Sequence, residues 1–313
     1  MQNEKEPMLS VVVFSYNHKE YIDTCLESIF RQKTDFIYEI LIADDASPDG
    51  TAQMVREKYG DRVRVLERKE NLGLCRNMYD AFMQARGKYI YECSGDDYLS
   101  TEYVFQKLAG YLEEHEDIFS VTGWNEMYDV AKGTKKTVEQ PYTEFTFLDL
   151  LRGKKIYFFI GMMRNTFKQD QPQYLCKGSR NNEEVQMWYY TLLKSKKIIL
   201  PERLYTYCYR TNGGSGTYNA RQDFLRMLGD YAQGFRAVEK ITQDKYKFDV
   251  AKITYYSSCI DYYIQNNGLK SAFKFLKVLR PGELASFAWI KFLMKLNHRE
   301  MPAFLLREER LIR

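Results

Sequence analysis

Short apolar runs alternate with amphipathic helix patterns through the first half of the chain, and this alternation restricts the fold more than any other feature. The run Leu9 to Phe14 is apolar and rich in valine, as expected for a strand buried on both faces. From Ile22 to Phe30, apolar side chains recur at helical spacing. The same order recurs around the runs Glu39 to Ala43 and Lys88 to Cys93. Strands joined through helices predict an α/β fold of Rossmann-like type, with a mostly parallel sheet flanked by helices.

Polar residues follow three of the predicted strands at the point where each strand ends. In open α/β sheets, ligands bind outside the carboxyl ends of the strands, so we expect these residues to line one edge. They are Ser15, Tyr16 and Asn17, then Asp44 and Asp45, then Asp96 and Asp97. A further helix is predicted from Leu74 to Arg86, closed by Gly87.

Composition excludes several classes of protein. A hydrophobic content of 45% and a charged content of 28% are ordinary for a globular chain, and the net charge of +4 argues against a nucleic-acid partner. The six cysteines contain no CxxC pair, so neither a zinc site nor a disulfide framework is expected. The polar start and the lack of a long apolar run predict a cytoplasmic protein without a secretory signal.

The sequence divides near residue 218, after the glycine-rich residues 212–216. We expect residues 1–218 to form the α/β domain and residues 219–313 to form an all-helical extension. From Gly268 onward the chain carries ten Lys and Arg against four Asp and Glu, interleaved with aromatic residues. Basic amphipathic helices of this kind bind anionic membranes, here the inner membrane surface, although packing on protein explains the pattern equally well.

The pair Asp96-Asp97 predicts a site for Mg²⁺ or Mn²⁺, because such hard cations take carboxylate ligands and complete their coordination with water and a diphosphate. The alternative is a solvated turn that caps the helix beginning near Thr101. For Asp44-Asp45, the carboxylates can accept hydrogen bonds from a base and a ribose, or can stabilise a turn. Tyr16 offers an aromatic platform for a base.

Four motifs in this order closely resemble family 2 glycosyltransferases of the GT-A fold. They are Ser10 to Asn17 (SVVVFSYN), Ile40 to Ser47 (ILIADDAS), Asn71-Leu-Gly73 with Arg76-Asn77, and Gly95-Asp96-Asp97. The resemblance covers roughly residues 8–215. It implies a nucleoside-diphosphate-sugar donor, usually a UDP-sugar, and inversion at the anomeric carbon.

The resemblance also implies roles for single residues. It places Asp45 and Tyr16 against the base and Asp97, with Asp96, at the metal. The donor-binding residues implied in this way are Ser15, Tyr16, Asn17, Asp44, Asp45, Asn71, Gly73, Arg76, Asp96 and Arg210. Arg76 is otherwise an ordinary surface charge.

The family's catalytic base lies at an acidic pair that opens a later helix, which here is Glu183-Glu184. Glu184 aligns with the base and Glu183 is its substitute; the alternative is that both are favourable first-turn charges of a helix. A downstream family element often carries a histidine that reaches the metal, but this chain has Asn212 near that place, which leaves a third protein ligand open.

The sequence thus predicts an inverting, metal-assisted transferase that moves a sugar to a hydroxyl of a glycan or lipid-linked acceptor. A nucleotidyltransferase would normally show a glycine-rich loop after the first strand, and residues 15–18 contain no glycine. A non-catalytic nucleotide-sugar-binding subunit of a glycan assembly complex is the second alternative.

Overall fold

The computed structural model describes residues 6–147, 149, 161–176 and 183–210. The chain separates into two compact units, of which the first comprises residues 1–147, 156–176 and 180–217. The second unit lies almost wholly outside the described residues, as does the helical extension expected from residue 219. None of the helices in the described ranges is long and apolar enough to cross a membrane.

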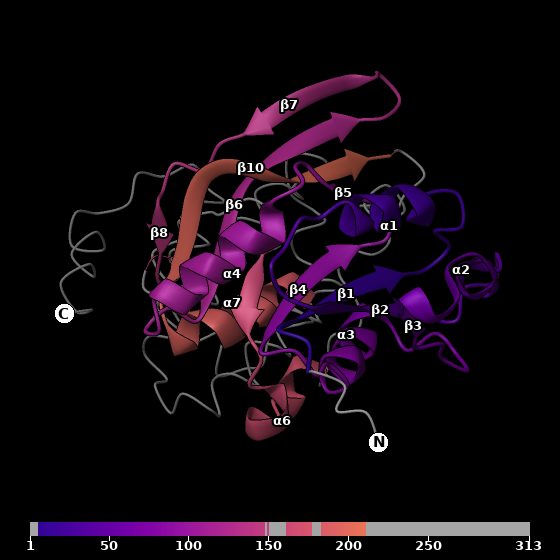
Figure 1. Cartoon of the computed structure of the whole chain (residues 1–313), viewed down its shortest axis with the longest axis horizontal. Coiled ribbons are helices and arrows are strands. Elements are labelled where there is room, and N and C mark those ends of the chain that lie inside the picture. The colour runs from indigo at the N-terminus through magenta and orange to yellow at the C-terminus, as the bar shows by residue number, and fades with distance from the viewer. Residues whose placement is uncertain (1–5, 148, 150–160, 177–182, 211–313) are drawn as a thin grey trace, which may run out of the picture. The chain divides into compact units, whose positions relative to one another are not determined.

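The first unit is built on one large sheet with helices on both faces (Figure 1). Its strands are β1 (Leu9–Ser15), β2 (Tyr38–Asp44), β3 (Arg64–Val65), β4 (Tyr89–Ser94), β5 (Tyr98–Leu99), β6 (Ser120–Asp129), β7 (Thr134–Val138), β8 (Glu144–Phe145), β9 (Met162–Arg164) and β10 (Lys197–Tyr209). Its helices are α1 (Ile22–Phe30), α2 (Thr51–Tyr59), η1 (Gly60–Arg62), α3 (Leu74–Phe82), α4 (Val104–Glu114), α6 (Phe167–Asp170), η2 (Gln173–Cys176) and α7 (Glu183–Lys194).

The order of strands is β3-β2-β1-β4-β9-β6-β10-β5, with β7 paired to β6 and β8 to β10. The four strands from β3 to β4 are parallel, as the alternation of strands and helices predicts. Beyond them, the short strand β9 runs antiparallel to both β4 and β6, and β6 and β10 are again parallel to each other. The sheet is therefore mixed, and its four adjacent parallel strands all come from the first half of the chain.

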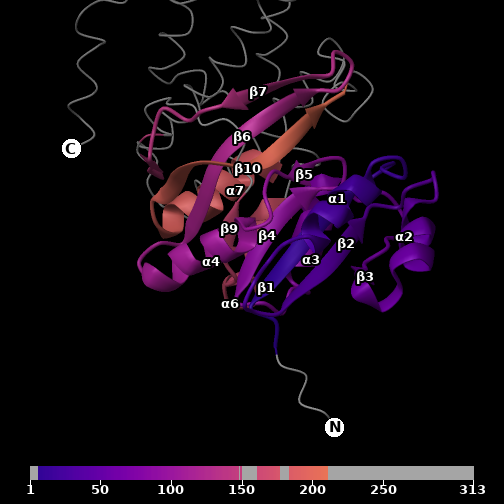
Figure 2. The same ribbon diagram turned by 45° about the horizontal axis from the view of Figure 1, so that its top comes forward.

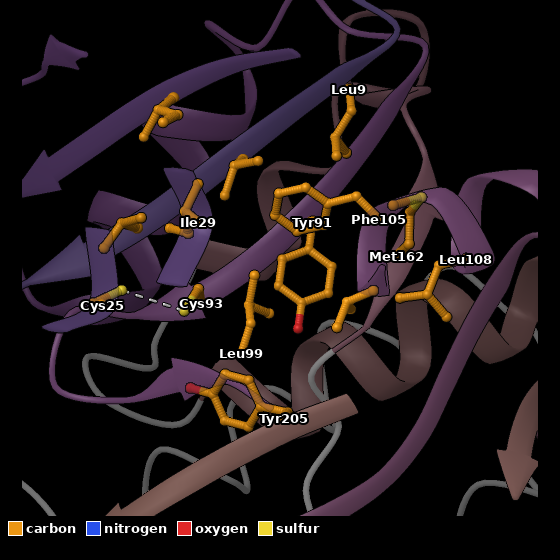
Figure 3. Close-up of a cluster of buried hydrophobic side chains, with 14 of the residues drawn as sticks. Leu9, Cys25, Ile29, Tyr91, Cys93, Leu99, Phe105, Leu108, Met162 and Tyr205 are labelled. Atoms are coloured by element: carbon orange, nitrogen blue, oxygen red, sulfur yellow. Dashed lines mark hydrogen bonds between the residues drawn. The ribbon is translucent and has the colours of Figure 1, made fainter. Parts of the chain in front are cut away.

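Two layers of buried side chains cover the faces of the sheet. On one face, alternate residues of β1 such as Val11 and Val13 pack with α1, α2 and α4. On the other face, Val12 and Phe14 pack with α3, α6 and α7. Figure 3 shows the first layer, where the Sγ atoms of Cys25 and Cys93 lie 3.6 Å apart. Burial on both faces explains why β1 is apolar at every position but its serines.

The helix predicted from Leu74 to Arg86 ends earlier than expected, at Phe82. Gly87 is consequently not its terminating residue. A Cβ atom at Gly87 would lie 2.5 Å from the backbone nitrogen of Ser10, so glycine is required there by the close approach of two backbones.

Candidate functional site

The carboxyl ends of β1, β2 and β4 lie side by side. The three strands are neighbours in the sheet (Figure 2). Ser15 is the register partner of Asp44, and Phe14 is the partner of Ser94. Beyond the strands, Asp45 N donates to Ser15 O at 2.9 Å, and Gly95 N donates to Phe14 O at 2.8 Å. The three polar clusters therefore leave the sheet at one edge.

The loop after β1 presents an aromatic ring at this edge. The side chain of Tyr16 is exposed, with 44% of the residue accessible to solvent. Asn17 has a left-handed backbone, with φ at 59°, and its N–H donates to Ser47 Oγ at 3.0 Å. Ser15 is buried, and its Oγ has no hydrogen-bond partner among the described residues. The exposed ring of Tyr16 offers a flat surface to a planar ligand.

The two carboxylates at the end of β2 are both buried and both accept hydrogen bonds from backbone N–H groups. Asp44 accepts hydrogen bonds from Ser47 N at 2.9 Å and from Ser47 Oγ at 2.6 Å, which matches the turn interpretation. Asp45 accepts from Leu72 N at 2.8 Å and from Gly73 N at 2.9 Å. Asp45 therefore fixes the loop that contains Asn71 and Gly73 beside the end of β2.

Helix α3 is attached to the same edge through its first turn. Asn77 Nδ2 donates to Ala43 O at 2.7 Å, and Arg68 Nε donates to Asn77 Oδ1 at 2.9 Å. By contrast, the exposed side chain of Arg76 forms an ion pair with Asp80, one turn along the helix, at 2.9 Å. The position of Arg76 thus matches the alternative of an ordinary surface charge.

Asp97 is turned into the protein. Its Oδ2 accepts a hydrogen bond of 2.5 Å from the hydroxyl of Tyr205, and its Oδ1 accepts one of 2.7 Å from Cys208 N. Burial, and then the charge of Asp96, raise the pKa of Asp97 well above its usual range, although the two hydrogen bonds and Arg210 oppose this. The sequence alone does not reveal this structural role of Asp97, because its partners Tyr205 and Cys208 lie more than a hundred residues downstream.

Asp96 has the more accessible carboxylate of the pair, with 17% of its side chain exposed. Ser94 Oγ donates to Asp96 Oδ1 at 2.5 Å. Arg210 Nη1 donates to Asp96 O at 2.7 Å and lies 3.4 Å from Asp96 Oδ2. Arg210 therefore reaches the loop after β4, where a diphosphate would benefit from a guanidinium.

His18 is a neighbour of this carboxylate that the sequence did not single out. Its Nε2 lies 3.9 Å from Asp96 Oδ1. Burial lowers the pKa of His18, as does Arg210, whereas the carboxylate of Asp96 raises it. The sequence does offer a signal, because His18 follows the polar residues after β1 and the chain has only three histidines.

These residues fit a divalent cation that keeps most of its coordination for water and substrate. Within the described ranges, no group of three or more His, Cys, Asp or Glu side chains could hold a metal. Both carboxylate oxygens of Asp97 are engaged by protein donors, whereas Asp96 and His18 present an oxygen and a nitrogen toward each other. Mg²⁺ and Mn²⁺ sites with one or two protein ligands are common where a diphosphate supplies the others.

The acidic pair Glu183-Glu184 occupies the first turn of α7, and the side chains of both residues lie outside the described part of the structure. Further along, Met187 and Tyr190 are buried against the sheet. The hydroxyl of Tyr190 donates to Asp170 Oδ2 at 2.7 Å, and Lys194 pairs with the same oxygen at 2.7 Å. The helix that carries the acidic pair is thus anchored to α6.

An open hollow of about 610 Å³ lies elsewhere, at the amino ends of β1 and β4, where Met8, Gly87 and Lys88 line it. This hollow is at the opposite edge of the sheet from the three polar clusters and contains none of the expected site residues.

Comparison with known proteins agrees with this geometry. Residues 10–170 match the model of the family described as "Glycosyl transferase family 2". The chain is 27% identical over 192 residues to the putative teichuronic acid biosynthesis glycosyltransferase TuaG of Bacillus subtilis, a match that covers 60% of this chain and 73% of that protein. It is 28% identical over 239 residues to the poly(ribitol-phosphate) β-N-acetylglucosaminyltransferase TarS of Staphylococcus aureus, covering 70% of this chain and 39% of that protein.

The fold agrees with a solved structure of S. aureus TarS residues 1–349 in complex with UDP-GlcNAc. The TM-score is 0.64 at 20% identity, and the match covers 92% of this chain and 80% of that one. Other relatives share less of their length: an uncharacterized protein of Mycobacterium tuberculosis, Rv1520, is 38% identical over 112 residues, which span 35% of this chain and 32% of that protein. Since the family model matches more than half of the 313 residues, this chain belongs to glycosyl transferase family 2.

Proposed function

We propose that this chain is an inverting glycosyltransferase that moves a sugar from a UDP-sugar to a hydroxyl group of a glycan or lipid-linked acceptor. The observation that carries the proposal is the meeting of the ends of β1, β2 and β4, which places Tyr16, Asp45 and Asp96 along one edge of the sheet. Solved structures of TarS in complex with UDP-GlcNAc and of a mannosyltransferase from Pyrobaculum calidifontis in complex with GDP-Man and Mn²⁺ share this fold and support a nucleotide-sugar donor.

The base of the donor stacks on the exposed ring of Tyr16. Asp45 holds the backbone of Leu72 and Gly73 beside it, and the carboxylate can also accept a hydrogen bond from the base. Asn71 and Asn17 complete the polar surface at this end. Arg210 contributes a positive charge for the diphosphate.

Asp96 would bind the divalent cation, Mn²⁺ or Mg²⁺, and Asp97 would hold the loop of Asp96 in place. When bound, the cation neutralises negative charge on the departing diphosphate. This assignment reverses the order implied by the sequence resemblance, because Asp97 is buried against Tyr205 and Cys208, whereas the carboxylate of Asp96 is partly exposed.

Glu184 at the start of α7 would remove the proton from the acceptor hydroxyl. The hydroxyl oxygen then attacks the anomeric carbon from the face opposite the diphosphate. A new glycosidic bond forms as the bond to the diphosphate oxygen breaks, so UDP leaves and the configuration inverts. The orientation of α7 by the contacts of Tyr190 and Lys194 with Asp170 supports this role.

We also propose that residues 1–218 form the catalytic domain and that the protein acts in the cytoplasm. Contact of the basic segment after Gly268 with the inner membrane surface is a proposal from sequence alone, since this segment lies outside the described residues.

The test is release of UDP from a panel of UDP-sugars in the presence of Mn²⁺, with and without glycan acceptors. We expect Glu184→Gln to lower turnover by at least about 100-fold, as expected for loss of a general base, while UDP affinity is kept. Glu183→Gln distinguishes the two residues, and Glu144→Gln, an exposed partner of Lys196, is the matched control. Binding of UDP without turnover in the wild-type protein would favour the non-catalytic subunit.

A further inference from the structure

Three segments that are distant in sequence meet around the carboxylate of Asp96. His18 comes from the loop after β1, Asp96 from the loop after β4, and Arg210 from the end of β10. Arg210 also lies over the ring of Tyr21, 4.1 Å from its centroid, which holds the guanidinium on the Oδ2 side of Asp96. His18 faces the other oxygen, Oδ1.

The backbone and ring of His18 are held firmly. His18 O accepts hydrogen bonds of 2.9 Å from Tyr21 N and Ile22 N, and His18 N donates to Thr51 Oγ1 at 3.2 Å. The ring packs on Gly95, where an added Cβ would lie 2.9 Å from Nδ1. Nδ1 is buried and has no hydrogen-bond partner among the described residues, so Nε2 is the nitrogen that can reach a ligand beside Asp96.

The separation between His18 Nε2 and Asp96 Oδ1 is 3.9 Å, which is too long for a hydrogen bond. Adjacent ligands of an octahedral cation, bound at about 2.0–2.2 Å, lie about 3 Å apart, so the two side chains would approach each other by about 1 Å when a cation binds. Oδ1 accepts one hydrogen bond from Ser94 Oγ and retains a second lone pair.

We propose that His18 Nε2 binds the same divalent cation as Asp96, and so supplies the nitrogen ligand for which the downstream element of this chain offers only Asn212. This inference rests on the proposed function, since it concerns the cation that accompanies the donor. The ligand set is then one imidazole and one carboxylate from two different strand ends, with water and diphosphate oxygens completing it. A nitrogen ligand favours Mn²⁺ over Mg²⁺, because imidazole suits transition metals and Mg²⁺ prefers oxygen.

The experiment is pulsed electron paramagnetic resonance of Mn²⁺ bound to the full chain with UDP. We expect modulation from a directly coordinated ¹⁴N nucleus in the wild-type protein, replaced by the ¹⁵N pattern when the protein carries ¹⁵N-labelled histidine. The signal should disappear in His18→Gln and persist in His115→Gln, a histidine at the end of α4. Mn²⁺ affinity should fall about 10–100-fold in His18→Gln, with a smaller change for Mg²⁺.

Circular dichroism melting shows whether each variant is folded, and His18→Phe, which keeps a ring beside Gly95, provides a second variant if glutamine is not tolerated. A wild-type complex without histidine modulation, or with modulation that survives in both His18 variants, would overturn the inference. Such a result leaves the proposed function intact if UDP-sugar turnover still requires metal. Absence of UDP binding would instead refute the proposed function itself.

Discussion

The hydroxyl of Tyr205 donates a 2.5 Å hydrogen bond to Asp97 Oδ2, and this contact ties β10 to the loop that follows β4. Both residues are buried, and Cys208 N completes the arrangement from the same strand. The carboxylate of Asp97 thus connects the loop after β4 to strand β10, which leads directly to Arg210. Loss of a hydrogen bond to a buried carboxylate lowers the free energy of unfolding, because no water molecule can replace the missing donor at the buried oxygen.

Replacement of Tyr205 with phenylalanine tests this connection. Tyr205→Phe removes one hydroxyl and leaves Asp97 Oδ2 without that donor, so we expect the free energy of unfolding to fall by about 1–3 kcal/mol. Urea denaturation followed by circular dichroism measures the change. Tyr209→Phe is the matched control on the same strand, where the side chain is exposed and little change is expected. Equal stabilities of the two variants would contradict a structural role for the contact.

Gly73 has backbone angles, φ 82° and ψ 153°, that are essentially restricted to glycine. Gly73→Ala should therefore cost about 1–3 kcal/mol of stability or shift the loop held by Asp45, and in either case weaken UDP binding. Gly110→Ala, in the middle of α4, is the opposite case, because an added Cβ meets nothing within 4 Å. There we expect a gain of about 0.5–1 kcal/mol. Thermal melts and UDP titration calorimetry report both effects.

The exposed ring of Tyr16 should contribute to donor binding by stacking alone. Tyr16→Ala is expected to weaken UDP binding by about 1–3 kcal/mol, the usual contribution of one stacked base, whereas Tyr16→Phe should bind almost as the wild type does. Tyr103→Ala removes a comparably exposed ring from the loop before α4 and serves as the control. If Tyr16→Ala and Tyr103→Ala bind UDP equally well, the base does not lie on Tyr16.

Lys197, at the start of β10, makes stability depend on pH. Burial lowers the pKa of Lys197 to about 7, against the opposing charge of Glu92, whereas an unfolded lysine titrates near 10.4. Between about pH 7 and 10 the unfolded chain therefore binds the additional proton. Stability should rise with pH across this window, by at most about 1.4 kcal/mol per unit for this one group.

Urea unfolding at pH 7, 8 and 9 measures this dependence. Lys197→Met should remove most of the rise, because the variant has no proton to release at this position. Lys196→Met changes an exposed lysine paired with Glu144 and should leave the slope as it is. A slope that is the same in all three proteins would mean that Lys197 does not titrate in this range.

The parallel part of the fold could be predicted because β1, β2 and β4 are each a short apolar run and are separated in the sequence by helix patterns. The pairing of β9 between β4 and β6 could not, since Met162–Arg164 is too short to show a period and its partners are up to 75 residues away. Likewise, β10 extends from Lys197, whereas the sequence alternates clearly only from Arg203. Pairing over such distances depends on tertiary contacts that local patterns do not contain.

At the site, the sequence located the strand ends but not the direction in which each side chain points. Asp96 and Asp97 are adjacent and chemically identical, and only the arrival of Tyr205 and Cys208 distinguishes them. His18 remained unnoticed for a similar reason, because its neighbour Asp96 lies 78 positions away, after a different strand. The ends of strands can be predicted from the pattern of neighbouring residues, whereas the contacts of a side chain depend on which strands pack together in the folded sheet.

Two register shifts interrupt the pairing of β10 with β6, on either side of Arg203. Tyr205, Cys208 and Arg210 all come after these irregularities and reach the loop of Asp96 and Asp97. Since side chains alternate along a strand, deletion of a single residue after Tyr205 would exchange the inward and outward positions that follow. A change of length just before Arg203 can be absorbed by the bulged backbone. Insertions should therefore be tolerated upstream of Arg203 but not in the part of the strand that follows Tyr205.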